Sequence, residues 1–212
     1  MQAQGVIVPT APALAGFGIG LALGGAPGPV QAVLLSESLH GLGRGFQALA
    51  GANLTFGFLL LASAAGLSQL VPAGSQLRVL ALAGGAVLLW LAIDGLRTAA
   101  RPIGGTAVGS TVPPFVRGAT IVLLNPGGWL FLATVGTAIF ASARQTGGPA
   151  LAVISAVAMT SGLAAGDAGV VLLGGWGLRR ARAGLRSWIQ RGLAAMLGGF
   201  GCWLLVRAVV AQ

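Results

Sequence analysis

Three carboxylates are available for ionic chemistry in this chain of 212 residues: Glu37, Asp94 and Asp167. Asp167 lies in an apolar, glycine-rich stretch, 12 residues before Arg179, so a helix would place it about 18 Å from that positive charge. A carboxylate so deep in a lipid bilayer costs about 3 kcal/mol and is rarely kept without a use. We therefore interpret Asp167 as a group that carries a proton or binds an amine, with a protonated packing element as the alternative.

Two proline motifs interrupt apolar stretches of the sequence. Pro27, Gly28 and Pro29 form the first, and Asn125 and Pro126 form the second. A proline removes a backbone hydrogen-bond donor and clashes with the preceding helical turn. The backbone groups freed in this way are tolerated in a membrane only where they face protein or a watery cavity. We interpret both motifs as broken helices that bind a small polar solute; ordinary kinks satisfied by neighbouring helices are the alternative.

Uncharged polar side chains occur near these breaks. Gln31 follows the first motif, and Asn53 and Thr55 lie in the second apolar stretch. Their grouping predicts that they contact the solute together with the two motifs and Asp167. Each could instead form a hydrogen bond between helices worth about 1 kcal/mol.

The other charged side chains are predicted to lie at the membrane boundary. Asp94 precedes Arg97 by three residues, which is the spacing of an ion pair on one helix face. Glu37 and His40 lie close to Arg44 in the sequence and are expected to form an interfacial charge cluster.

Several classes of function are excluded by counting residues. Cysteine and histidine occur once each, as Cys202 and His40, which excludes disulfides, zinc sites of the common types and a nucleophile with a well-placed base. We therefore expect no enzyme activity, no cofactor and no metal. The net charge of +9 does not indicate nucleic-acid binding, because the arginines lie between apolar runs and form no single basic face.

The composition indicates which elements must position these groups. Only 7% of the residues are charged, against about 25% in a soluble domain, while 56% are hydrophobic and 37 are glycine. This favours an all-α integral membrane protein, embedded in lipid, with closely packed helices. Six apolar segments approach the length of about 20 residues that spans a bilayer. They are Ala13–Ser36, Phe46–Leu67, Arg78–Ile93, Val116–Phe140, Leu151–Trp176 and Gly192–Val210.

Three spans, a linker rich in proline and glycine, and three further spans indicate an internal duplication. The expected halves of this single membrane domain are residues 11–96 and 116–211, joined by 97–115. Because each half has an odd number of spans, the two would be inverted repeats. Nine arginines lie in the first, third and fifth connections and three lie elsewhere. Since positive loops stay in the cytoplasm, both termini are expected outside.

Glycines recur at a spacing of four residues in two of the spans. Gly16, Gly20 and Gly24 lie in the first span, and Gly162 and Gly166 lie in the fifth. Small residues at this spacing let helix backbones approach closely. We expect them to pack inside the bundle, with a homodimer interface as the alternative.

Most of the chain resembles the lysine exporter superfamily, including its homoserine and threonine efflux branch. The resemblance is carried by APGPVQAVLLSESLHGLGRGFQALAGAN, RGATIVLLNPGGWLFLA and GDAGVVLLGGWGLRR. It implies a six-span exporter of amino acids or related small solutes in the inner membrane of a bacterium, driven by the proton gradient. Residues 27–29, 125–126 and Asp167 match the family's motif positions. The alternative function is a non-transporting membrane subunit of a larger complex.

Overall fold

The computed structural model describes residues 11–66, 75–99, 112–177 and 183–210, and every regular element in these residues is a helix. The first half contains α1 (Ala11–Gly25), α2 (Pro29–His40), α3 (Leu42–Ala64) and α4 (Ser75–Ala99). The second half contains α5 (Pro114–Leu123), α6 (Pro126–Phe131), the π-helical turn η2 (Leu132–Gly136), α7 (Thr137–Leu172), the π-helical turn η3 (Leu173–Gly177) and α8 (Ala183–Val210).

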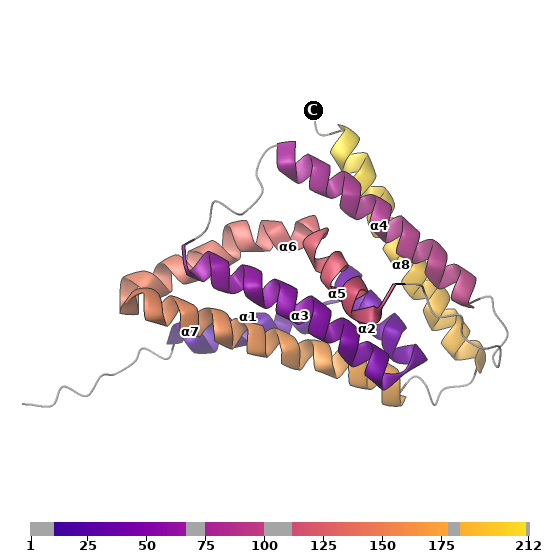
Figure 1. Cartoon of the computed structure of the whole chain (residues 1–212), viewed down its shortest axis with the longest axis horizontal. Coiled ribbons are helices and arrows are strands. Elements are labelled where there is room, and N and C mark those ends of the chain that lie inside the picture. The colour runs from indigo at the N-terminus through magenta and orange to yellow at the C-terminus, as the bar shows by residue number, and fades with distance from the viewer. Residues whose placement is uncertain (1–10, 67–74, 100–111, 178–182, 211–212) are drawn as a thin grey trace, which may run out of the picture.

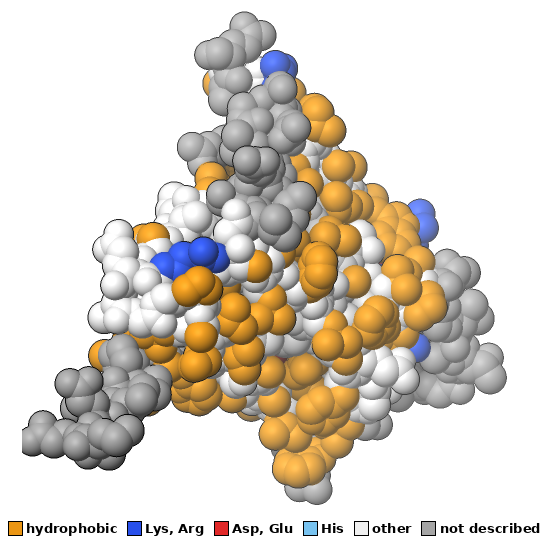
Figure 2. All heavy atoms as spheres, turned by 60° about the vertical axis from the view of Figure 1, so that its left-hand side comes forward, with side chains coloured by type: hydrophobic (Ala, Val, Ile, Leu, Met, Phe, Trp, Pro, Cys, Tyr) orange, Lys and Arg blue, Asp and Glu red, His pale blue; other side chains and the backbone are white. Residues whose placement is uncertain are grey.

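Three helical stretches among the described residues are long and apolar enough to cross a membrane: Leu42–Ala64, Pro126–Gly177 and Ser187–Val210. Helices α1 and α2 pass the same test as a pair and would form a fourth span, bent by 62°. Figure 2 shows one face of the molecule on which hydrophobic side chains predominate. The described residues are therefore all helical, and by length and hydropathy they contain three or four candidate membrane spans, as expected of a membrane protein.

Both proline motifs break the helix in which they lie, as the sequence predicts. Helix α1 ends at Gly25, Gly28 is extended with φ −169° and ψ −177°, and Pro29 begins α2. Helix α5 ends at Leu123, and the Asn125 side chain caps α6 by accepting a hydrogen bond of 3.0 Å from the backbone N–H of Gly127. The fixed φ of proline suits the first turn of a helix, which explains why α2 and α6 restart at these residues.

The predicted boundary between the fourth and fifth spans takes the form of a kink within α7. Two helices meet there at Gly147 and Gly148, and Gly148 adopts a φ of +73° that a side chain would disfavour. Pro149 follows the kink and starts the second helical part. The connection is therefore only two residues long.

The glycine series predicted to pack closely forms the contact between α1 and α7. A methyl group on Gly20 would overlap the carbonyl oxygen of Met159, and one on Gly162 would overlap that of Phe17. Gly24 approaches Leu163 in the same way. The prediction of packing inside the bundle is confirmed for these helices.

Replacing Gly20 by Ala is expected to destabilise the protein by about 1–3 kcal/mol, because the added methyl group must push α1 away from α7. Gly18 lies on the same helix and has open space around its Cα, so Gly18→Ala is the matched control. It should be neutral or stabilising by up to about 1 kcal/mol, the helix-propensity gain. Thermal unfolding of both variants in detergent tests this. Equal melting temperatures would show that the close approach of α1 and α7 does not limit stability.

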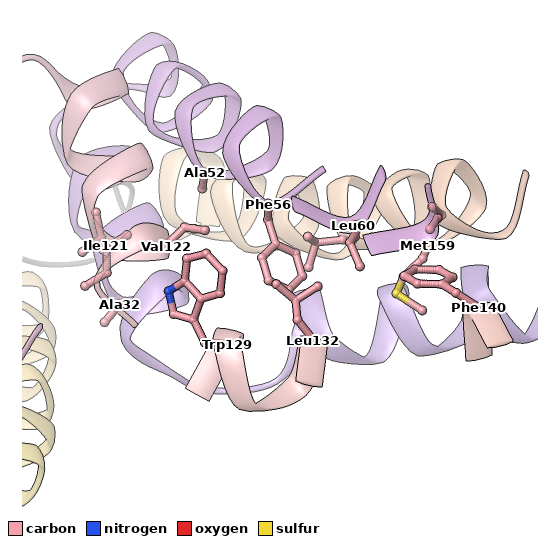
Figure 3. Close-up of a cluster of buried hydrophobic side chains, with 14 of the residues drawn as sticks. Ala32, Ala52, Phe56, Leu60, Ile121, Val122, Trp129, Leu132, Phe140 and Met159 are labelled. Carbon is pink, nitrogen blue, oxygen red and sulfur yellow. The ribbon is translucent and has the colours of Figure 1, made fainter. Parts of the chain in front are cut away.

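Helices α4 and α8 pack along each other and form one flank of the molecule, whereas α1, α3 and α7 form the other (Figure 1). The two flanks meet mainly through α2, α5 and α6, which are the elements next to the two helix breaks. Buried apolar side chains around the second break hold it in place: Trp129 and Leu132 pack near Phe56 and Leu60 of α3 (Figure 3).

Candidate functional site

A cavity of about 690 Å³ lies where the two helix breaks face α4 and α8. Residues 27–29 of the first break and residues 125–128 of the second both line it. Gln31 and Asp167 line it as well. The structure thus brings seven of the nine predicted solute contacts, from three separate parts of the chain, to one cavity.

Asp167 is the buried acid of this cavity, with 1% of the residue exposed. Its Oδ2 accepts a hydrogen bond of 2.7 Å from Nδ2 of Asn53 on α3, and its Oδ1 accepts one of 3.3 Å from Nε2 of Gln31 on α2. Gly24 and Gly166 let α1 and α7 approach closely beside the carboxyl group. The carboxyl group is therefore held by side-chain amides from two other helices.

Gln31 connects Asp167 to the first helix break. Its Nε2 also lies within hydrogen-bond distance of the carbonyl oxygens of Leu23 and Gly24, at 3.3 and 3.2 Å. These carbonyls belong to the last turn of α1, where the regular helical N–H partners are missing, and that of Leu23 also accepts from the backbone N–H of Ala26 at 3.3 Å. The same amide group therefore links the carboxylate to the end of α1.

At the second break, a backbone carbonyl group accepts a hydrogen bond from a side chain that was not predicted from the sequence. The indole N–H of Trp129 donates a hydrogen bond of 2.7 Å to the carbonyl oxygen of Leu123, at the end of α5. The free backbone groups predicted at the breaks are thus partly used by Trp129 and Gln31. No local pattern identified Trp129, because its partner lies six residues back, across the break.

The two predicted contacts on α3 do not line the cavity. Asn53 donates a hydrogen bond to Asp167 but does not itself line the cavity, and its Oδ1 is buried without a hydrogen-bond partner. The hydroxyl of Thr55 donates to the carbonyl oxygen of Gly51, one turn earlier in its own helix, at 2.8 Å. Asn53 is therefore placed to support the carboxylate, whereas the hydrogen bond of Thr55 is local.

Most of the remaining cavity wall is apolar. Aromatic rings come from Phe56, Phe131, Phe200 and Trp203, and the rings of Phe56 and Phe131 are 6.2 Å apart at a tilt of 42°. Arg78, near the start of α4, is the one arginine among the described lining residues. From the sequence, Arg78 was only the first residue of the third apolar segment, because the packing of α4 decides which space it lines.

A cluster of charged side chains lies on α2, α4 and α5, at the ends of these helices that are remote from the cavity. Glu37 is 1% exposed and accepts hydrogen bonds from Arg44 at 2.9 Å and from Arg117 at 2.5 Å. Arg117 also pairs with Asp94 and lies over the Trp90 ring, 5.5 Å from its centroid. The cluster joins both halves of the chain.

This cluster confirms one contact expected from the sequence and adds a partner that the sequence did not indicate. Glu37 pairs with Arg44, its neighbour in the sequence, at 2.8 Å, and Glu37 is buried between helices. Arg117 of α5 pairs with both Glu37 and Asp94. Neighbour spacing gave no sign of Arg117, because it lies 80 residues from Glu37 in the sequence and reaches it only through the packing of α5 on α2.

Comparison with known proteins gives one family. The model of a family described as "LysE type translocator" matches residues 21–208, which is most of the chain. The searches of curated proteins and of solved structures gave no match.

Proposed function

The chain belongs to the LysE type translocator family, and from this premise we propose that it exports amino acids or related small solutes across the inner membrane of a bacterium, in exchange for protons. The family consists of translocators rather than enzymes. The observation that carries the proposal is the cavity that both helix breaks share with one buried carboxyl group. Broken helices beside a central cavity are how many secondary transporters form their solute sites.

Asp167 is the proposed point of coupling. When it is ionised, its carboxylate can bind the ammonium group of the solute in the cavity while Asn53 and Gln31 donate to its oxygens. A proton that enters from outside neutralises the carboxylate and removes its attraction for the ammonium group, so the solute leaves. Loss of that proton to the cytoplasm restores the site for the next solute. One carboxyl group thus makes binding of the proton and the amine mutually exclusive.

The proposed architecture is six spans arranged as two inverted repeats, residues 11–96 and 116–211. The pattern of helix contacts supports it. Helix α1 of the first half packs on α7 of the second, and α5 of the second half packs on α3 of the first. In a repeat, α1 would correspond to α5 and α3 to α7, so exchanging the two halves exchanges these two contacts. The contact between α4 and α8 is unchanged by the exchange. Each half also places a proline break after its first helix.

The proposed orientation has both termini outside, because most arginines lie in connections that would then be cytoplasmic. In this orientation the start of α4 and the end of α8, which line the cavity, face outward. The cluster of Glu37, Arg44, Asp94 and Arg117 then lies on the cytoplasmic side. The structure would correspond to a state with an outer cavity and a closed inner end.

Transport measurements on proteoliposomes test this function. Vesicles that hold the purified protein are loaded with single labelled amino acids, and efflux is followed with and without an opposing proton gradient. We expect gradient-dependent efflux of at least one amino acid, abolished by a proton ionophore. If no amino acid or amine leaves these vesicles faster than it leaves vesicles without the protein, the exporter proposal is wrong. A non-transporting membrane subunit then becomes the better account of the chain.

A further inference from the structure

Two opposite charges line a cavity whose other walls are uncharged. Asp167 is the one acid and Arg78 the one base among the described residues that line it. Asp167 is buried and hydrogen-bonded, whereas Arg78 is exposed and takes part in none of the ion pairs of the described residues. An arginine offers a planar, forked set of donors that matches a carboxylate. The cavity therefore presents partners for both an ammonium and a carboxylate group.

Helix α4 lies against the second break at Gly84 and carries Arg78 to the cavity. Gly84 packs so closely on α5 that a methyl group there would overlap the carbonyl oxygen of Leu124. Arg78 lies six residues earlier in the same helix, which is about 9 Å along the axis. Its long side chain can extend toward the cavity or toward water, because it is exposed. Arg78 is thus anchored at its backbone and free at its guanidinium group.

The aromatic and aliphatic walls disfavour a solute with further charges. Phe56, Phe131, Phe200, Trp203 and Leu204 carry no anionic group that could pair with a second ammonium group of the kind lysine carries. A charge placed there would lose water and gain at most a cation–π contact. A cavity of about 690 Å³ also falls in the range of sites for molecules larger than the smallest amino acids. An apolar side chain would displace water from these walls and gain free energy by burial.

We propose that the solute is a zwitterion with a large apolar or aromatic side chain, whose ammonium group binds Asp167 and whose carboxylate binds Arg78. This inference rests on the proposed function as an exporter. It assigns a role in selectivity to Arg78, which is not one of the family's motif positions. The side chain of the solute would lie against the aromatic side chains of the cavity wall, which belong to α3, α6 and α8.

Binding of four probes to the purified protein tests the assignment, with melting temperature as the readout. The probes are phenylalanine, phenethylamine, which lacks the carboxylate, 3-phenylpropionate, which lacks the ammonium group, and lysine. We expect phenylalanine to bind most tightly. Arg78→Gln should lower the affinity for phenylalanine by about ten- to a hundredfold, the effect of losing one charged hydrogen bond. It should leave the affinity for phenethylamine unchanged. Arg78→Lys should retain part of the affinity, and Arg191→Gln, an exposed charge of α8 outside the cavity, should retain all of it.

Two results would overturn the inference. One is tighter binding of lysine than of phenylalanine, and the other is an equal loss of phenylalanine and phenethylamine in Arg78→Gln. The efflux assay separates this failure from that of the proposed function. Gradient-driven export of lysine or threonine without phenylalanine would leave the exporter intact and refute the selectivity, whereas no transport of any amino acid would refute the exporter itself.

Discussion

Replacing Asp167 by Asn is expected to lower proton-driven efflux by about ten- to a hundredfold, the effect of losing one charged hydrogen bond of about 1.5–3 kcal/mol. Asn keeps the shape of the side chain, and its one carbonyl oxygen can still accept a hydrogen bond from Asn53 or from Gln31. It cannot carry a proton or attract an ammonium group as an anion. Insertion into the membrane should be unharmed or improved, because a buried charge is removed. Gradient-driven efflux from proteoliposomes measures the loss.

Two further variants make this prediction specific. Asp167→Glu keeps the titratable group and should retain part of the efflux with a changed pH profile, because the longer side chain moves the carboxyl group in its pocket. Ser161→Ala is the matched control on the same helix, since its exposed hydroxyl donates only to the carbonyl oxygen of Val157. Wild-type efflux by Asp167→Asn between about pH 6 and about pH 8 would show that the acid is a packing element. Failure of Asp167→Asn to accumulate would lead to the same conclusion.

Replacing Arg117 by Gln is expected to destabilise the protein by up to about 3–5 kcal/mol, because the buried Glu37 then keeps only one of its two arginine partners. Arg117 holds Glu37 and Asp94 and therefore joins α5 to α2 and α4. Arg97→Gln is the matched control, since Arg97 is exposed on α4 and an exposed charge contributes less than about 1 kcal/mol. Thermal unfolding in detergent gives the comparison.

A double-mutant cycle shows whether the cluster acts as a unit. Glu37→Gln should also be destabilising, and the variant that combines it with Arg117→Gln should lose less stability than the sum of the two single variants, because the pair between Glu37 and Arg117 is then removed as a whole and neither of these two charges is left without the other. Strictly additive losses would contradict the ion pair as a source of stability. Equal stability of Arg117→Gln and Arg97→Gln would show that the cluster contributes little to the fold.

The sequence by itself determined the features that follow from local backbone chemistry and from composition. Pro29 and Pro126 lack a backbone donor and clash with the preceding turn, so an interruption of the helix at these residues was predictable, and both begin new helices. The spacing of Gly16, Gly20 and Gly24 indicated a close helix contact without a known partner. The scarcity of charges indicated a membrane protein, and the rarity of a deep carboxylate singled out Asp167. Each of these inferences needs only a residue type and its neighbours along the chain.

Only the tertiary structure decided which distant groups meet. The hydrogen bonds of Asp167 join it to residues 114 and 136 positions away, and Arg117 reaches Glu37 across 80 positions. A helix fixes the face on which each side chain lies but not the helix that covers this face, so Asp94 was assigned to its sequence neighbour Arg97. Arg78 was likewise recognisable only as a charge near a helix start. Its place on the cavity wall depends on how α4 and α8 pack beside the two broken helices, because that packing forms the cavity that Arg78 and Asp167 line.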